Sequence, residues 1–229
     1  SIKPDTTITE LAGMCYTSDS SLSRLALKLG YKNFNAFKQD ILGMKNEFDD
    51  LFIDNNFFNH MSGTTYMNIV CDSIKNIDHE KLVKDIDYLC QLIMLSDNIY
   101  FFATHIPGDM TKIIQRATLA AGKYVTFYTD REMQLALAKT TKRDDLCIFI
   151  SLEGTLVSEK KITLPIVASG SRMVLITQIA DMKFSSYFDY VISLGERNKD
   201  FTGKFKLLYF IDCFIYQFFH YSNQLKKIP

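Results

Sequence analysis

The sequence predicts two structural parts, an all-α segment at the N-terminus and a doubly wound α/β domain in the remainder. From about residue 6 to residue 84, apolar residues recur three and four positions apart, which is typical of helices. From residue 98 onward, short β-rich runs alternate with helical segments, which predicts a parallel sheet covered by helices on both faces. We therefore expect an all-α domain at 1–45, a helical linker at 46–84 and the α/β domain at 85–229.

The composition is that of an ordinary globular protein. The 229 residues are 47% hydrophobic and 23% charged, and the 26 Lys and Arg balance the 26 Asp and Glu. The five cysteines form no CxxC pair, so we expect no disulfide framework, no metal and no cofactor. The first residues lack an apolar signal segment, and the most apolar stretch, 205–221, is shorter than the ~20 residues of a bilayer span. The sequence thus predicts a cytoplasmic protein outside the membrane.

Five strands and three intervening helices account for the α/β pattern. The expected strands are Ile99–Thr104, Tyr124–Tyr128, Leu146–Ser151, Met173–Thr177 and Tyr190–Leu194, and the expected helices are Met110–Ala121, Glu132–Lys139 and Ile162–Ser169. Gly122 and Gly170 follow two of these helices, where a left-handed C-terminal cap belongs. Five parallel strands within about 100 residues predict a small, flavodoxin-like sheet.

The N-terminal segment predicts a helix-turn-helix. Thr7 or Thr9 can cap a first helix, a turn follows at Tyr16–Ser18, and Ser18 can cap a second helix. In this arrangement the second helix enters the major groove of DNA and presents its N-terminal residues to base edges. The residues expected to pack the two helices together are Ile8, Leu11, Ala12, Leu22, Leu25 and Leu29.

The second helix carries residues suited to DNA. Small hydroxyls allow close approach, and Arg24 can donate to guanine or to phosphate. Between Ser1 and Lys45 six basic and four acidic residues give a local net charge of +2, which supports DNA binding only modestly. The candidate DNA-binding residues are Ser18, Ser20, Ser21, Arg24, Lys28 and Lys32.

The same segment resembles the RpiR (MurR-type) family of bacterial regulators, whose members read "I-x-E-L-A", a turn, then "S-x-x-T-x-x-R-F-x-x-K-L-G-[FY]-x-x-F-x-x-F-K". The matching residues are Ile8-Thr9-Glu10-Leu11-Ala12, Ser18, Arg24, Lys28-Leu29-Gly30-Tyr31, Phe34, Phe37 and Lys38. Ser21 stands for Thr and Leu25 for Phe. The family's DNA-binding domain has further helices before this point, so we expect its first helices to be missing from this sequence.

The resemblance implies that the second domain is a sugar isomerase (SIS) domain that binds phosphosugars. Such domains carry "G-x-G-x-S" after the first strand and "S-x-S-G-x-T" after the third, where small residues surround a phosphate. Here the loops read Ala103-Thr104-His105-Ile106-Pro107 and Ser151-Leu152-Glu153-Gly154-Thr155-Leu156. The candidate ligand residues are Thr104, His105, Ile106, Ser151, Glu153, Gly154 and Thr155.

These altered loops leave three alternatives, because a carboxylate at Glu153 repels a phosphate. In the first alternative, the site binds a different ligand, neutral or cationic, or an anion that His105 helps to hold. In the second, the site is degenerate and the domain only dimerises. In the third, His105 and Glu153 form an acid–base pair for sugar isomerisation. We favour a regulator without enzymatic activity and with no catalytic residues.

The resemblance therefore implies a transcription regulator that binds operator DNA and senses a sugar phosphate or related carbohydrate. The last helix is apolar around most of its circumference between Leu207 and Phe219, which predicts burial against a twin subunit as well as its own sheet. We expect a homodimer, with a tetramer as the next larger assembly. Burial within a single subunit is the alternative explanation for this helix.

Overall fold

The structure is a computed structural model that divides into two compact units, Ser1–Ser62 and Gly63–Pro229, and each is treated by itself. The described residues are 6–29, 31–38, 62–179, 185–196 and 203–225. The first part of the expected linker, residues 46–61, lies outside them. The domain bounds expected at residues 45 and 84 stay a prediction.

The first unit contains the two expected helices, α1 (Ile8–Met14) and α2 (Asp19–Lys28). Thr7 caps α1 in a capping box: its hydroxyl accepts from the Glu10 backbone N–H, and its own N–H donates to the Glu10 carboxylate at 2.7 Å. The turn between the helices passes through Tyr16, which has a positive φ of 52°. Ser18 then caps α2 by accepting from the Ser21 N–H, as the sequence predicts.

The two helices pack through fewer residues than we expected. Leu11 and Ala12 of α1 are buried against Leu22 of α2, and Ile8 and Phe34 pack at the edge. Two residues assigned to this contact, Leu25 and Leu29, are 43% and 57% exposed, so that part of the prediction is wrong. The reason is length: α1 has seven residues and spans about 10 Å, too little to cover the C-terminal half of α2.

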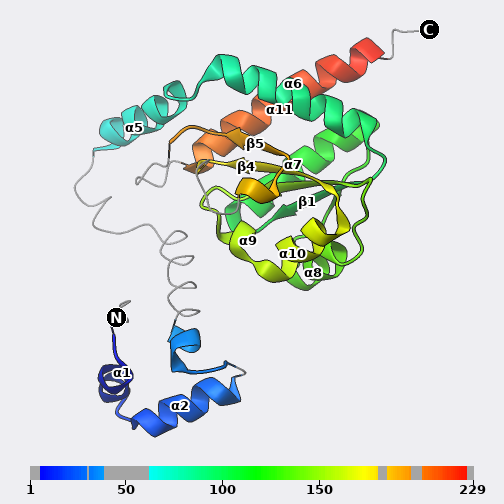
Figure 1. Cartoon of the computed structure of the whole chain (residues 1–229). Coiled ribbons are helices and arrows are strands. Elements are labelled where there is room, and N and C mark those ends of the chain that lie inside the picture. The colour runs from blue at the N-terminus through cyan, green and yellow to red at the C-terminus, as the bar shows by residue number, and fades with distance from the viewer. Residues whose placement is uncertain (1–5, 30, 39–61, 180–184, 197–202, 226–229) are drawn as a thin grey trace. The chain divides into compact units, whose positions relative to one another are not determined.

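The second unit is built on a five-stranded, all-parallel sheet in the order β2-β1-β3-β4-β5 (Figure 1). This is the flavodoxin-like order, and it confirms the predicted fold class. Each strand lies within one residue or two of its predicted bounds. The strands are β1 (Ile99–Ala103), β2 (Thr126–Phe127), β3 (Leu146–Ile150), β4 (Arg172–Thr177) and β5 (Tyr190–Ser193).

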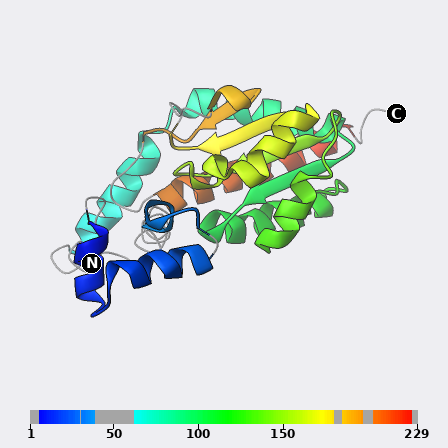
Figure 2. The same cartoon turned by 60° about the horizontal axis from the view of Figure 1, so that its bottom comes forward.

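Helices cover both faces of this sheet (Figure 2). Alternate strand residues point to opposite faces, so in β1 Phe101 joins one buried cluster and Phe102 joins the other. The Phe101 face is covered by α6 (His79–Leu95), α7 (His105–Ala120) and α11 (Gly203–Leu225), with α5 (Gly63–Lys75) packed against α11. The Phe102 face is covered by α8 (Arg131–Ala138), α9 (Thr155–Ser158) and α10 (Lys160–Ser169).

Both predicted glycine caps are present. Gly122 has a φ of 90° and follows α7, where its N–H and that of Lys123 donate to the Leu119 and Thr118 carbonyls. Gly170 ends α10 with a φ of 72°. These left-handed residues turn the chain from each helix into the next strand.

Helix α11 buries most of its apolar surface inside its own subunit. Leu207, Phe210, Phe214 and Phe218 are fully buried in the cluster formed with the sheet and the neighbouring helices. Most of the apolar surface of α11 is therefore buried within one subunit, which is the alternative to burial against a twin subunit. Among the described residues, no helix has the length and apolar character needed to span a membrane. The same residues contain no group of three or more His, Cys, Asp or Glu side chains arranged to hold a metal ion.

Candidate functional site

Helix α2 presents a polar face away from α1. Ser20, Arg24 and Lys28 are exposed, whereas Leu22 and Ala26 on the opposite side are buried. Lys32, which follows the helix, is also exposed. The predicted contact residues thus lie on the surface that a major groove could reach.

The hydroxyls at the start of α2 form a small network. The Ser18 Oγ lies 3.0 Å from the Ser20 Oγ and 2.9 Å from the Ser21 Oγ. The Arg24 Nε donates to the Ser20 carbonyl at 3.2 Å, which holds the guanidinium along the helix. Thr9 of α1 donates to the Asp19 carboxylate at 2.7 Å and fixes the start of α2 against α1. These bonds therefore join the start of α2 to α1 and to the side chains of its own first turn.

The candidate ligand loops meet at the carboxyl edge of the sheet. Ala103 at the end of β1 pairs in register with Ile150 at the end of β3. The next residues, Thr104 and Ser151, therefore leave the sheet from adjacent strands, which lie about 5 Å apart. β2 lies beyond β1 and β4 lies beyond β3, so this is the point where the strand order reverses. Ligands of such sheets bind at this point.

The loop after β1 is shorter than we expected, because α7 already begins at His105. His105 has a φ of 55°, a left-handed conformation that suits the glycine expected there from the family pattern and costs about 1 kcal/mol or more for another residue. Gly108 in the first turn of α7 lies against β1, since a Cβ there would come within 3.2 Å of the Ala103 carbonyl oxygen. Thr104 is half-buried and its hydroxyl makes no capping bond.

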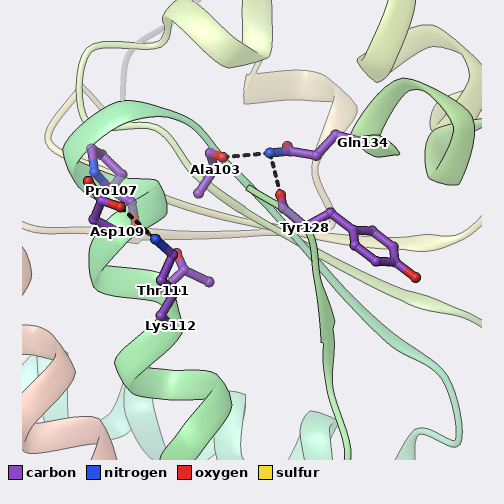
Figure 3. Close-up of polar contacts among 7 residues, drawn as sticks. All are labelled: Ala103, Pro107, Asp109, Thr111, Lys112, Tyr128 and Gln134. Atoms are coloured by element: carbon purple, nitrogen blue, oxygen red, sulfur yellow. Dashed lines mark hydrogen bonds and ion pairs between the residues drawn. The ribbon is translucent and has the colours of Figure 1, made fainter. Parts of the chain in front are cut away.

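A side chain from the opposite face of the sheet holds this loop in place (Figure 3). The buried Gln134 of α8 donates its amide to the Ala103 and Tyr128 carbonyls, at 2.8 Å each. Figure 3 also shows the first turns of α7, where Thr111 donates to the Pro107 carbonyl at 2.7 Å. The end of β1 is thereby tied to the end of β2. Gln134 was not among the predicted site residues.

The loop after β3 keeps two features of a phosphate-binding loop. The buried Ser151 accepts from the Leu156 N–H at 3.3 Å, and Gly154 has a positive φ of 76° at the start of α9. Thr155 is exposed in the first turn of that helix. Two small buried residues, Ser151 and Gly154, therefore lie at this part of the edge.

Glu153 points toward the next strand instead of the β1 loop. Its carboxylate accepts from the amide of Gln178, the residue directly after β4. Its charge also acts on Lys206, a buried residue in the first turn of α11. Burial lowers the pKa of the Lys206 ammonium, and the Glu196 and Glu153 carboxylates partly offset this. Neither Gln178 nor Lys206 was predicted as a site residue.

This arrangement offers groups that can bind a polar ligand. The edge offers a hydroxyl at each of Thr104 and Ser151 and an imidazole at His105. Further along it lies a cluster of the half-buried Glu153 carboxylate, the Gln178 amide that donates to it, and the buried Lys206 ammonium. The cluster holds Glu153 through Gln178, so the two groups of the suggested acid–base pair have different surroundings.

The chain resembles several curated transcription regulators. It is 21% identical over 199 residues to the uncharacterized helix-turn-helix-type regulator YbbH of Bacillus subtilis, which covers 85% of the chain and 70% of the relative. It is 24% identical over 181 residues to a regulator of the same type from Clostridium perfringens, with 76% and 64% covered. A third such relative, from Providencia stuartii, is 23% identical, with 64% and 54% covered. No protein-family model matches the chain.

Solved structures share the fold. The Vibrio vulnificus NanR protein complexed with ManNAc-6P aligns with a TM-score of 0.55 and 18% identity over 97% of this chain and 84% of its own. The sugar isomerase domain of an RpiR transcription factor from Sphaerobacter thermophilus aligns with a TM-score of 0.56 and 11% identity, covering 69% and 91%. A Methanococcus jannaschii protein with an inferred function of 3-hexulose-6-phosphate isomerase gives 0.54 and 19%, with 69% and 91% covered. The second unit therefore has the sugar isomerase fold, and the sequence relatives are helix-turn-helix regulators.

Proposed function

We propose that the chain is a DNA-binding transcription regulator of the RpiR type that recognises its operator through α2. The single observation that carries the proposal is the capped, exposed polar face of α2 in a chain whose second unit has the sugar isomerase fold. The same function is supported by the helix-turn-helix regulators of Bacillus subtilis and Clostridium perfringens, which align with 85% and 76% of the chain at 21% and 24% identity.

The residues divide into two roles on DNA. Ser20, Ser21 and Arg24 lie near the N-terminal half of α2, which in a helix-turn-helix faces base edges. Lys28 and Lys32 follow on the exposed side and bind the phosphate backbone. The chain binds DNA as a homodimer held by its α/β unit, since two-fold symmetry presents two such helices to one operator.

The α/β unit senses a carbohydrate derivative at Thr104–Ile106 and Ser151–Thr155. The support is the position of these loops at the strand-order reversal, together with the NanR structure of the same fold, which holds ManNAc-6P. A sugar isomerase activity is the second candidate, because neighbours of the same fold include sugar-phosphate isomerases. Turnover of an aldose or ketose phosphate that Glu153→Gln abolishes would favour that candidate over the regulator.

Replacing Arg24 by Ala is expected to weaken operator binding by about 1–3 kcal/mol, roughly 5- to 150-fold, and to relax base preference at one position of each half-site. The physical reason is loss of a charged donor from the exposed face of α2. Fluorescence anisotropy with the DNA upstream of the chain's own gene measures this change. The control is Arg172→Ala, which removes the same exposed group from the start of β4. Unchanged affinity and preference in Arg24→Ala would contradict the assignment of α2.

A further inference from the structure

The exposed face of α2 carries an apolar side chain among its polar ones. Leu27 is 59% exposed and follows Ser20 and Arg24 in the order i, i+4, i+7, so the three residues form one stripe of the helix. Leu22 and Ala26, on the opposite side, are 6% and 0% exposed. An exposed leucine is ordinary on a protein surface, but this one stands on the face that we assign to DNA.

The side chain of Arg24 leaves Leu27 uncovered. The Arg24 Nε donates to the Ser20 carbonyl at 3.2 Å, so this side chain extends toward the N-terminus of α2. Side chains of a helix lean toward its N-terminus, and Leu27 therefore lies over the turn that contains Ser23 and Arg24. The stripe thus presents, in order along the helix, a hydroxyl, a charged donor and a branched apolar group.

An apolar group on this stripe has one suitable partner in a major groove. The base edges there present hydrogen-bond donors and acceptors, except for the 5-methyl group of thymine, which apolar side chains contact. Leu27 has no donor for a phosphate and no donor or acceptor for a polar base edge. Phosphate contacts set the register of a protein on DNA without reading its sequence, whereas a methyl contact distinguishes thymine from the other bases.

We propose that Leu27 contacts the 5-methyl group of a thymine in each half-site of the operator and so determines part of the operator sequence. The inference rests on the proposed function and adds one base to the sequence that α2 recognises. Along the axis of α2, Leu27 lies about 4.5 Å beyond Arg24. Base pairs are about 3.4 Å apart, so the thymine lies one or two base pairs from the position that Arg24 contacts.

The size of this contact follows from the apolar surface that it removes from water. Burial of one methyl or methylene group changes affinity by about fourfold. This is less than the effect of a charged donor that bonds to a guanine, so Arg24 remains the stronger determinant. Leu27 therefore refines the set of sequences that Arg24 and the phosphate contacts already select.

The test compares thymine with uracil in the DNA upstream of the chain's own gene. Deoxyuridine lacks only the 5-methyl group, and it replaces thymidine at one position at a time. For the wild-type chain, we expect one such change, close to the position at which Arg24→Ala relaxes base preference, to weaken binding about fourfold in fluorescence anisotropy. Leu27→Ala should bind the unsubstituted duplex about fourfold more weakly and should not respond to that change, since the two groups act as a pair.

The matched control is Leu29→Ala, which shortens a 57% exposed leucine on the side of α2 that carries Leu22 and Ala26. This variant should keep the fourfold response to deoxyuridine. A wild-type chain that binds every deoxyuridine duplex as tightly as the thymine duplex would overturn the inference, and this result needs no variant. A response that persists in Leu27→Ala would also overturn it, because the methyl group would then act through the shape of the DNA.

A comparison of the upstream DNA with a scrambled duplex separates this inference from the proposed function. Equal affinity for the two duplexes would contradict DNA recognition by α2 and, with it, the role of Leu27. Specific binding of the upstream DNA without a response to deoxyuridine would contradict only the role of Leu27.

Discussion

At the scale of single residues, Gln134 shows how one buried side chain positions the candidate ligand site. Its amide bridges the carbonyls at the ends of β1 and β2, which have no neighbour strand beyond those points to donate to them. Because Ala103 directly precedes Thr104 and His105, this bridge also fixes where α7 begins. The side chain is fully buried, so water cannot replace it without rearrangement.

Gln134→Leu is expected to lower the free energy of unfolding by about 1–3 kcal/mol in total, because two carbonyls lose their donor while the buried Gln134 Oε1, which has no partner among the described residues, is also removed. Urea denaturation followed by circular dichroism measures this loss. Glu132→Gln, an exposed change on the same helix, is the control and should stay within about 0.5 kcal/mol of the wild-type protein. A Gln134→Leu variant as stable as that control would show that the bridge contributes nothing.

At the scale of elements, the capping box of α1 stabilises the first helix of the N-terminal unit. The helix has only seven residues, so its backbone donors depend on the cap more than those of a long helix do. Hydrogen bonds from the Thr7 N–H and hydroxyl lower the pKa of the Glu10 carboxyl. The ionised carboxylate is therefore the form that the cap stabilises.

Thr7→Ala is expected to destabilise α1 by about 1 kcal/mol, seen as faster amide hydrogen exchange in α1 while exchange in α8 is unchanged. The contribution of Glu10 is present above its unfolded pKa of 4.5 and is lost as the pH falls through the lower folded value. The protection of α1 amides, taken as the exchange rate relative to the intrinsic rate at the same pH, should therefore fall at acid pH in the wild-type protein and less so in Glu10→Gln. Equal acid responses in both proteins would contradict this role for Glu10.

The elements were largely predictable because their signals are local. The β-rich runs located all five strands, and the glycines at Gly122 and Gly170 marked two helix ends. The start of α7 was missed because the apolar period begins only at Met110, while Pro107 is compatible with a first turn. The exposure of Leu25 could not be predicted, since it depends on how far α1 extends along α2.

The candidate site was predictable only where its residues follow one strand in sequence. The loops after β1 and β3 were found from a family pattern, and the strand order places them side by side. Gln178 and Lys206 were not found, because they lie 25 and 53 positions from Glu153 in the chain and only the fold places them at the same edge of the sheet. Lys206 also lies in the first turn of an apolar helix beside Lys204, where a lysine resembles an ordinary surface residue.

At the scale of the whole molecule, we propose that the first unit binds DNA and that the second unit binds a metabolite. The exposed apolar residues of α11, such as Leu208 and Tyr216, are few, so α11 by itself is a weaker basis for dimerisation than the sequence suggested. The need for two recognition helices on one operator is the stronger reason for a dimer.

The most direct test of the central claim is the specificity of DNA binding by the whole chain. Fluorescence anisotropy at physiological salt compares the DNA upstream of its own gene with a scrambled duplex of equal length and composition. We predict that the upstream DNA binds at least about 10³-fold more tightly, as specific regulators do. Equal affinity for the two duplexes would contradict the assignment of this chain as a transcription regulator.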